Sequence, residues 1–124
     1  LAIDVLDRTG LLEKANRPAG ELTLLERKRL ELAKALSTQP ALLLLDEIAG
    51  GLTEHECHEL VELINSLRKE GITLIWIEHI VHALVSVVDR LLVIDFGVKL
   101  DEGEPHAVMN NPKVQEIYMG ISAE

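Results

Sequence analysis

The central apolar block of the chain runs directly into two carboxylates. Residues 41–45 are Ala-Leu-Leu-Leu-Leu, and Asp46 and Glu47 follow at once. A short unbroken apolar run is typical of a strand buried on both faces, as in a parallel sheet between helices. Unpaired carboxylates are costly in apolar surroundings, so this pair predicts a functional site at the strand's carboxyl end. The alternative is a strand that simply emerges into solvent at Asp46.

A helix with a well-marked beginning is predicted before this strand. Thr23 and Glu26 have the spacing of a capping box, in which a hydroxyl accepts from the third amide and the carboxylate reaches back. Pro40 predicts the end of the element. The apolar stripe expected to face the core is Leu25, Leu32 and Leu36.

A second, more strongly patterned helix follows the loop after Glu47. Thr53 and Glu56 repeat the capping-box spacing, and Gly71 is a typical stop. Acidic residues gather near the start of this helix and basic residues near its end, as the helix dipole favours. The predicted buried stripe is Cys57, Leu60, Val61, Ile64 and Leu67.

The remaining segments continue an alternation of helices and strands. Residues 1–12 indicate the end of a helix, with Ile3, Leu6 and Leu11 on one side and Gly10 as its stop. Strands are predicted at 72–77 and 91–95, with an antiparallel return at 98–100. Helices are predicted at 80–88, from 104 to about 110, and from 112 to 118. Such an alternation is typical of a parallel sheet with right-handed crossovers.

Composition narrows the class of protein. The chain has 124 residues, enough for one domain or part of a larger one, and 48% of them are hydrophobic. The formal net charge of -9 argues against an extended nucleic-acid partner, which requires clustered cations. No apolar run is long enough to span a bilayer, so membrane association would be indirect. Leu1 stands where an initiating Met is expected, which indicates a longer parent chain.

Two predicted strands end in polar pairs. Asp46-Glu47 follows the first, and Glu78-His79 follows the second. If the strands are neighbours, both pairs lie at one edge of the sheet. Such an edge would have the side chains that phosphoryl transfer needs: one acid to hold Mg²⁺, one acid to position a water and one imidazole to contact a phosphate. The alternative for His79 is a hydrogen-bonded structural role.

A zinc site is not predicted, although His55, Cys57 and His58 lie close together in the sequence. Cys57 belongs to the buried stripe of its helix, and the two histidines do not share that face. A structural zinc site needs four converging ligands.

Taken together, these motifs resemble the carboxyl-terminal part of an ABC transporter ATPase subunit. The likeness is greatest to the ATPase subunits of branched-chain amino-acid importers. It covers essentially all of the chain and is carried by the Asp-Glu strand, the capped helix before it and the strand ending in His79. Three further stretches support it: residues 17–24, 27–36 and 118–120.

The resemblance implies an α/β fold, a P-loop NTPase-type parallel sheet with flanking helices. The amino-terminal part with the P-loop would lie outside this chain. Residues 1–124 would be the carboxyl-terminal part of one ABC ATPase domain. Within it, residues 1–38 would end the helical subdomain and form the signature helix, residues 39–103 would be core strands and helices, and residues 104–124 would be carboxyl-terminal helices.

The resemblance also implies roles for single residues. Asp46 would be the Walker B acid that contacts Mg²⁺ through its water shell, and Glu47 the catalytic base that polarises the attacking water. His79 would be the switch residue on the γ-phosphate. The signature motif that faces ATP would be formed by Thr23, Leu24, Leu25 and Glu26, after Leu22. Residues 50–53 would form the loop that crosses to the partner subunit.

Several positions depart from the family pattern. Leu24 and Leu25 replace the two signature glycines, and Glu26 replaces a neutral glutamine. Thr53 stands where many members carry Asp, and Ile48 where they carry Pro. None of the eight glycines starts a G-x-x-x-x-G-K-[ST] sequence, the phosphate-binding P-loop. We therefore expect the isolated chain to bind ATP weakly or not at all.

The function implied by the resemblance is ATP hydrolysis coupled to import of branched-chain amino acids, with ATP and Mg²⁺ as cofactors. The partners would be a second ATPase subunit, in a homo- or heterodimer, and membrane permease subunits, with no nucleic acid. The location would be cytoplasmic, peripheral on the inner face of the plasma membrane. Two alternatives remain: a truncated, non-catalytic interaction fragment, and an ABC-type ATPase of chromosome maintenance or repair, which usually needs coiled-coil heptads that are absent here.

Overall fold

The computed structural model describes residues 1–120 and divides the chain into two compact units, Leu1–Ala83 and Leu84–Glu124. The last four residues of the predicted carboxyl-terminal segment 104–124 lie outside the described residues. Each unit has its own pair of strands: β1 and β2 in the first, β3 and β4 in the second. No helix within residues 1–120 has the length and apolar character needed to cross a bilayer.

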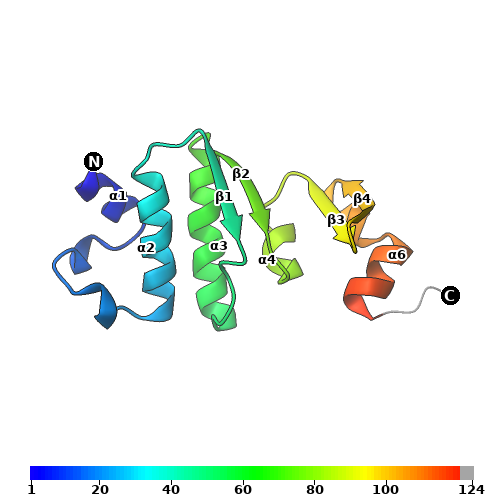
Figure 1. Cartoon of the computed structure of the whole chain (residues 1–124), viewed down its shortest axis with the longest axis horizontal. Coiled ribbons are helices and arrows are strands. Elements are labelled where there is room, and N and C mark those ends of the chain that lie inside the picture. The colour runs from blue at the N-terminus through cyan, green and yellow to red at the C-terminus, as the bar shows by residue number, and fades with distance from the viewer. Residues whose placement is uncertain (121–124) are drawn as a thin grey trace. The chain divides into compact units, whose positions relative to one another are not determined.

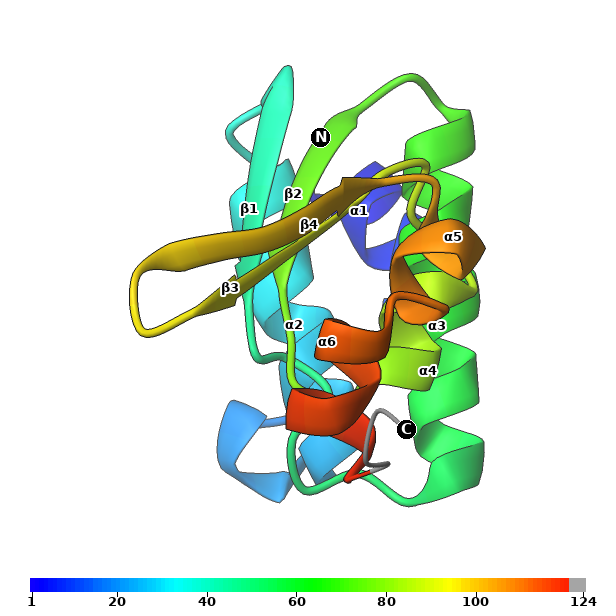
Figure 2. The ribbon, with the colours of Figure 1, turned by 90° about the vertical axis from the view of Figure 1, so that its right-hand side faces the viewer.

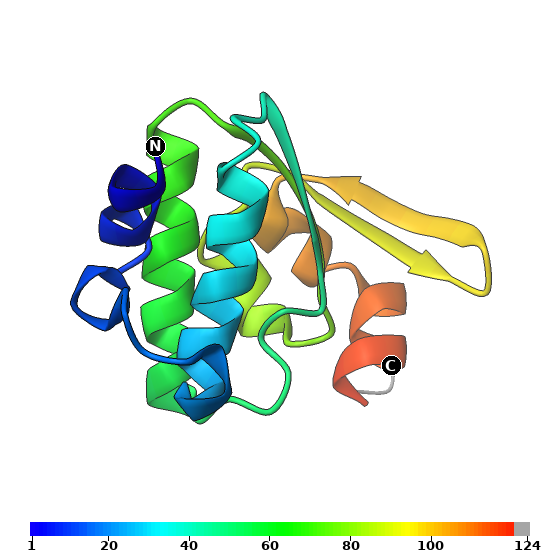
Figure 3. The ribbon, with the colours of Figure 1, turned by 60° about the vertical axis from the view of Figure 1, so that its left-hand side comes forward.

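The first unit is built around a strand–helix–strand segment. Strand β1 (Leu42–Asp46) pairs in parallel with β2 (Thr73–Ile77), and α3 (Glu54–Lys69) connects them (Figure 1). Helix α2 (Leu24–Leu36) lies beside α3 along the strands (Figure 3). The parallel pairing predicted for these two strands is confirmed. The two strands are separated by far more chain than a hairpin allows, so a crossover helix is the expected connection. The third predicted strand, residues 91–95, does not join them among the described residues and pairs only with the strand that follows it.

The core of this unit is formed by the apolar stripes of α2 and α3. The capping box predicted for α3 is confirmed, because Thr53 accepts from the Glu56 amide and Glu56 accepts from the Thr53 amide. The one predicted for α2 is only half formed: Thr23 accepts from the Glu26 amide, but among the described residues the Glu26 carboxylate pairs with Lys14 and not with the Thr23 amide. One member of the predicted α3 stripe is wrong, because Leu63 is buried in place of Val61. The buried residues are Leu25, Leu32, Ala33 and Leu36 from α2, and Cys57, Leu60, Leu63, Ile64 and Leu67 from α3.

The sheet of the first unit is buried on one face only, which corrects the prediction of strands buried on both faces. Leu43 and Leu45 are 4% and 6% exposed, whereas Leu44, between them, is 67% exposed. On β2, Ile75 and Ile77 are likewise exposed. Successive side chains of a strand point to opposite faces, and α2 and α3 cover only one of them. An unbroken apolar run therefore did not mean two covered faces.

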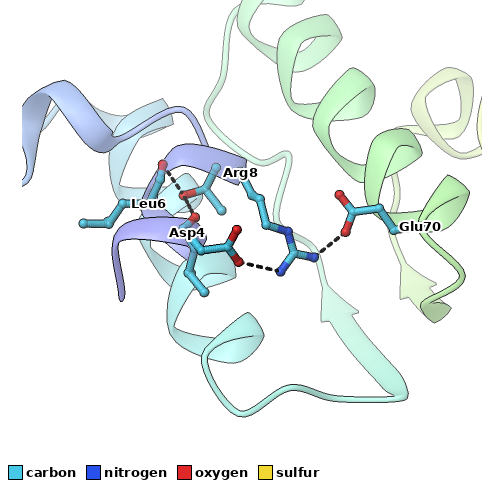
Figure 4. Close-up of polar contacts among 6 residues, drawn as sticks. Asp4, Leu6, Arg8 and Glu70 are labelled. Atoms are coloured by element: carbon cyan, nitrogen blue, oxygen red, sulfur yellow. Dashed lines mark hydrogen bonds and ion pairs between the residues drawn. The ribbon is translucent and has the colours of Figure 1, made fainter. Parts of the chain in front are cut away.

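An ion pair joins helix α1 (Ala2–Arg8) to the end of α3. Arg8 forms ion pairs with Asp4 on its own helix and with Glu70, directly after α3 (Figure 4). The predicted stop at Gly10 is supported by its φ of +74°, a left-handed conformation that glycine adopts without strain. The predicted buried side needs correction, because Ile3 is exposed while Val5 is buried.

The second unit contains an antiparallel hairpin and short helices. Strands β3 (Leu91–Asp95) and β4 (Val98–Gly103) pair as predicted, with a longer return than residues 98–100. Both turn residues, Phe96 and Gly97, have positive φ, the geometry of a tight two-residue hairpin turn. The helices are α5 (Pro105–Met109), at the end of the hairpin away from its turn (Figure 2), and α6 (Pro112–Val114), which continues into a π-helical turn (Gln115–Met119).

One further helix lies between β2 and β3 in the sequence. Helix α4 (Val81–Val85) is shorter than the predicted range 80–88.

In the second unit, Glu104 caps α5 by accepting from the amides of His106 and Ala107, which lowers the pKa of that carboxyl. The Tyr118 hydroxyl donates to the carbonyl of Ile94 at 2.6 Å, so the carboxyl-terminal turn is held to β3.

Candidate functional site

The register of β1 and β2 brings the two polar pairs to one edge of the sheet. Asp46 and Ile77, the last residues of β1 and β2, are opposite each other. The Glu47 amide then donates to the Ile77 carbonyl at 2.7 Å, which holds the residue after β1 against the end of β2. The predicted common edge is therefore present.

Glu47 and His79 face each other at this edge. His79 Nδ1 lies 4.0 Å from Glu47 Oε1, and the two side chains are 65% and 60% exposed. Glu47 has a φ of +49°, a left-handed conformation that is uncommon for a residue other than glycine. Such conformations gather at functional sites, because the surrounding structure must hold them there.

The exposure of the carboxylates corrects one step of the sequence argument. Asp46 and Glu47 are both exposed, so the cost of burying charge does not mark them as functional. What distinguishes them is position: they end a parallel strand, and an imidazole on the neighbouring strand lies close by. The carboxyl ends of parallel strands are where α/β folds bind ligands.

Glu78 is the buried acid of the cluster, and no role beyond its pairing with His79 was predicted for it. Its side chain has no exposed surface, and its Oε1 lies 3.2 Å from His79 Nδ1. Its Oε2 accepts from the Ala49 amide at 3.1 Å, so it contacts the loop that follows Glu47. The sequence offered one signal for a role of Glu78, its position between an apolar strand and a histidine. Only the tertiary contact shows that Glu78 holds the Ala49 amide.

The predicted signature segment lies at the start of α2. The Thr23 hydroxyl accepts from the Glu26 amide at 3.3 Å. Leu25 is buried in the core, whereas Leu24 is 44% exposed. Leu24 also contacts the loop after β1, because a Cβ built on Gly51 would lie 3.1 Å from Leu24 Cδ2.

Lys14 is a site residue that the sequence did not reveal. Its Nζ lies 2.5 Å from Glu26 Oε1 and reaches it from the short 3-10 turn Leu12–Lys14. This contact, with a smaller contribution from Thr23, lowers the pKa of the Glu26 carboxyl. The negative charge of Glu26 is therefore balanced within the chain. The other oxygen, Glu26 Oε2, is buried and has no hydrogen-bond partner among the described residues.

The two predicted groups of site residues are separate. Across residues 1–120, no hydrogen bond or ion pair joins Thr23 or Glu26 to Asp46, Glu47 or His79. No group of three or more His, Cys, Asp or Glu side chains in the described part of the chain is arranged to hold a metal ion. The donor set at the sheet edge nevertheless fits Mg²⁺, which commonly uses one or two protein carboxylates together with waters and substrate phosphates.

Solved structures with this fold define the class of protein. An ATP-binding cassette of an ABC transporter in its ADP conformation superposes with a TM-score of 0.88 at 32% identity, covering 97% of this chain and 49% of that one. A nucleotide-free ATP-binding cassette from an ABC transporter gives a TM-score of 0.87 at 31% identity, with the same coverage. The chain therefore has the α/β fold of the corresponding half of an ABC ATPase, a P-loop NTPase-type fold.

Sequence relatives narrow this class. The chain is 43% identical over 116 residues to the high-affinity branched-chain amino acid transport ATP-binding protein LivG of Escherichia coli, covering 93% of this chain and 46% of LivG. It is 40% identical, with the same coverage, to BraF of Pseudomonas aeruginosa, which carries the same description. The chain spans about half the length of these relatives and is homologous to the carboxyl-terminal part of ABC transporter ATP-binding proteins. No protein-family model matches it.

Proposed function

We propose that the chain forms the carboxyl-terminal part of an ATP-hydrolysing ABC importer subunit that serves branched-chain amino acids. The observation that carries the proposal is the meeting of Asp46-Glu47 with His79 at one sheet edge, in a chain 43% identical to LivG. The substrate class comes from what LivG and BraF are described as transporting.

The geometry of the edge supports a division of labour among three side chains. Asp46, the last residue of β1, would contact Mg²⁺ through its water shell. Glu47 would orient the attacking water and accept its proton, since it is exposed and next to Asp46. His79 would contact the γ-phosphate from the other side of the same edge. When bound, Mg²⁺ supplies charge neutralisation on the phosphate oxygens.

The start of α2 would face the nucleotide of a second ATPase subunit. The helix amino terminus offers unpaired amides and a positive dipole end, which suit a phosphate. Thr23 caps this end, and Lys14 offsets the charge of Glu26 beside it. Leu24 narrows the approach, because a leucine stands where the family has a glycine. Partner permease subunits would hold the assembly at the cytoplasmic face of the membrane.

We also propose that residues 1–124 alone do not hydrolyse ATP. The sequence contains no G-x-x-x-x-G-K-[ST] run, so it does not carry the backbone cradle that binds the β- and γ-phosphates. Asp46, Glu47 and His79 would then act only on a nucleotide that other residues deliver.

The substitution Glu47→Gln in the intact subunit tests the assignment of the base. It keeps the size of the side chain and removes the proton acceptor, so ATP turnover should fall by at least about a hundredfold. Nucleotide binding, measured by titration with a fluorescent ATP analogue, should stay within about twofold. The matched control is Glu31→Gln on the exposed face of α2, which should leave both quantities unchanged. Parallel loss of binding and turnover in the Glu47 variant would show that Glu47 is structural.

A further inference from the structure

The feature that the proposed mechanism leaves unused is the buried carboxylate of Glu78. Its side chain has no exposed surface, whereas the neighbouring side chains of Glu47 and His79 are more than half exposed. A charged group without solvent must be held by hydrogen-bond donors or opposite charges, because burial otherwise costs several kcal/mol. The contacts of Glu78 therefore identify what its burial stabilises.

Those contacts extend in two directions. On one side, Oε2 accepts from the Ala49 amide at 3.1 Å; Ala49 is fully buried, two residues after Glu47. On the other side, Oε1 accepts from the His79 amide at 3.0 Å and lies 3.2 Å from His79 Nδ1. One carboxylate thus connects the loop after β1 with the residue after β2.

A carboxylate is well suited to these contacts. An ionised carboxylate only accepts hydrogen bonds and has two oxygens for the purpose, so it can serve the Ala49 amide and His79 together. A nitrogen lone pair at Nδ1 would be repelled by these oxygens. We therefore expect the hydrogen of a neutral His79 ring on Nδ1, the nitrogen that lies 3.2 Å from Glu78 Oε1 and 4.0 Å from Glu47 Oε1.

We propose that Glu78 is a positioning residue that sets the separation and orientation of Glu47 and His79 by holding the Ala49 amide and the His79 ring with its two oxygens. Two hydrogen bonds then maintain the left-handed φ of Glu47. The Glu47 amide donates to the Ile77 carbonyl, and two residues later the Ala49 amide donates to the Glu78 carboxylate. The catalytic meaning of this arrangement rests on the proposed function, but the arrangement itself does not.

Two variants of Glu78, examined by NMR on this chain without nucleotide, test the proposal. In Glu78→Ala, hydrogen exchange of the Ala49 amide should accelerate about tenfold or more, because a bond to a charged acceptor is lost. Glu78→Gln keeps the shape but has a single oxygen. It can serve Ala49 or His79, not both, so it should change either the Ala49 exchange rate or the ring tautomer of His79.

The tautomer is measured from the imidazole ¹⁵N shifts at about pH 9, above the range in which histidines usually titrate. The unsubstituted chain should show the Nδ1–H form of His79. The matched control is Glu62→Gln, which alters the exposed pair of Glu62 with His58 and should leave His79 and Ala49 unchanged.

Two outcomes would overturn the proposal. The first is an Ala49 exchange rate and a His79 tautomer that are the same in all variants. The second is equal acceleration of the Ala49 amide and of the Leu60 amide in the core helix α3, since that would mean a general loss of stability. If Glu78→Ala does not fold, the isosteric glutamine variant decides alone. None of these readouts involves ATP, so a failed ATPase assignment would leave them interpretable.

Discussion

Glu26 shows most clearly how neighbouring residues change the electrostatic effect of a single side chain. In the sequence it is a negative charge at the start of a helix that, in the proposed function, would face a phosphate. In the structure its Oε1 lies 2.5 Å from Lys14 Nζ, and the side chain is only 17% exposed. A cation from a separate turn thus offsets a negative charge that would be unfavourable beside a phosphate.

This contact predicts an acid-dependent loss of stability. The pKa of Glu26 is lower in the folded chain than its ordinary value of 4.5, chiefly because of Lys14. The ion pair therefore contributes stability at pH above that value, and the contribution is lost as the pH falls through the lowered pKa. Lys14→Met, which keeps an apolar stem, should reduce stability at about pH 7 and have a smaller effect at about pH 3.

Urea unfolding followed by circular dichroism at the two pH values measures this difference. Lys34→Met is the matched control, because Lys34 forms an exposed pair with Glu31 and such pairs contribute little. An equal effect of Lys14→Met at both pH values would contradict the assigned role of the charge.

At the scale of elements, strand β1 illustrates the difference between apolar composition and burial. Its leucines alternate between a covered and an open face, as in any strand, although the sequence shows no polar alternation. Leu44 and Ile75 are opposite one another on the open face, where both are exposed. The helices, in contrast, carry polar faces, and their buried stripes could be identified almost fully from the spacing.

The two faces of β1 predict different responses to the same substitution. Leu45→Ala removes a 6% exposed side chain under α2 and α3 and should lower the free energy of unfolding by ~2–5 kcal/mol. Leu44→Ala, one residue earlier, removes a 67% exposed side chain and should change it by less than ~1 kcal/mol.

Chemical denaturation of both variants under the same conditions provides the comparison, and each serves as the control for the other. Equal destabilisation would show that the outer face of β1 is covered in solution.

At the scale of the whole molecule, the chain has the fold of half an ABC ATPase, and its candidate residues divide into two groups. Asp46, Glu47 and His79 share the edge of the β1–β2 sheet. Thr23 and Glu26 lie at the start of α2, without a bond to that edge among the described residues. Such a division is expected if the two groups serve different nucleotides, as the proposed pairing of subunits requires.

The isolated chain should therefore bind ATP only weakly. Isothermal titration of ATP with Mg²⁺ into residues 1–124 should give a dissociation constant of ~1 mM or weaker, because most phosphate contacts are made by a P-loop. The same titration into an intact subunit is the control. A dissociation constant near 1 μM for the isolated chain would contradict the proposal.

Much of the fold followed from local patterns. Thr53 and Glu56 marked the start of α3, Gly10 and Gly71 marked helix ends, and the alternation of apolar runs with amphipathic segments indicated a parallel sheet. These features depend on interactions within a few residues, so the sequence records them directly. The position of Leu63 was missed because adjacent apolar residues leave the edge of a helical stripe ambiguous.

By itself, the sequence determined which residues end the strands: Asp46-Glu47 and Glu78-His79. Only the tertiary structure decided how they meet. The parallel register set the distance between Glu47 and His79, and burial turned Glu78 into a contact between Ala49 and His79. Lys14 and Glu26 likewise met only through folding. Spacing along the chain reports local geometry, whereas contacts across elements depend on how those elements pack.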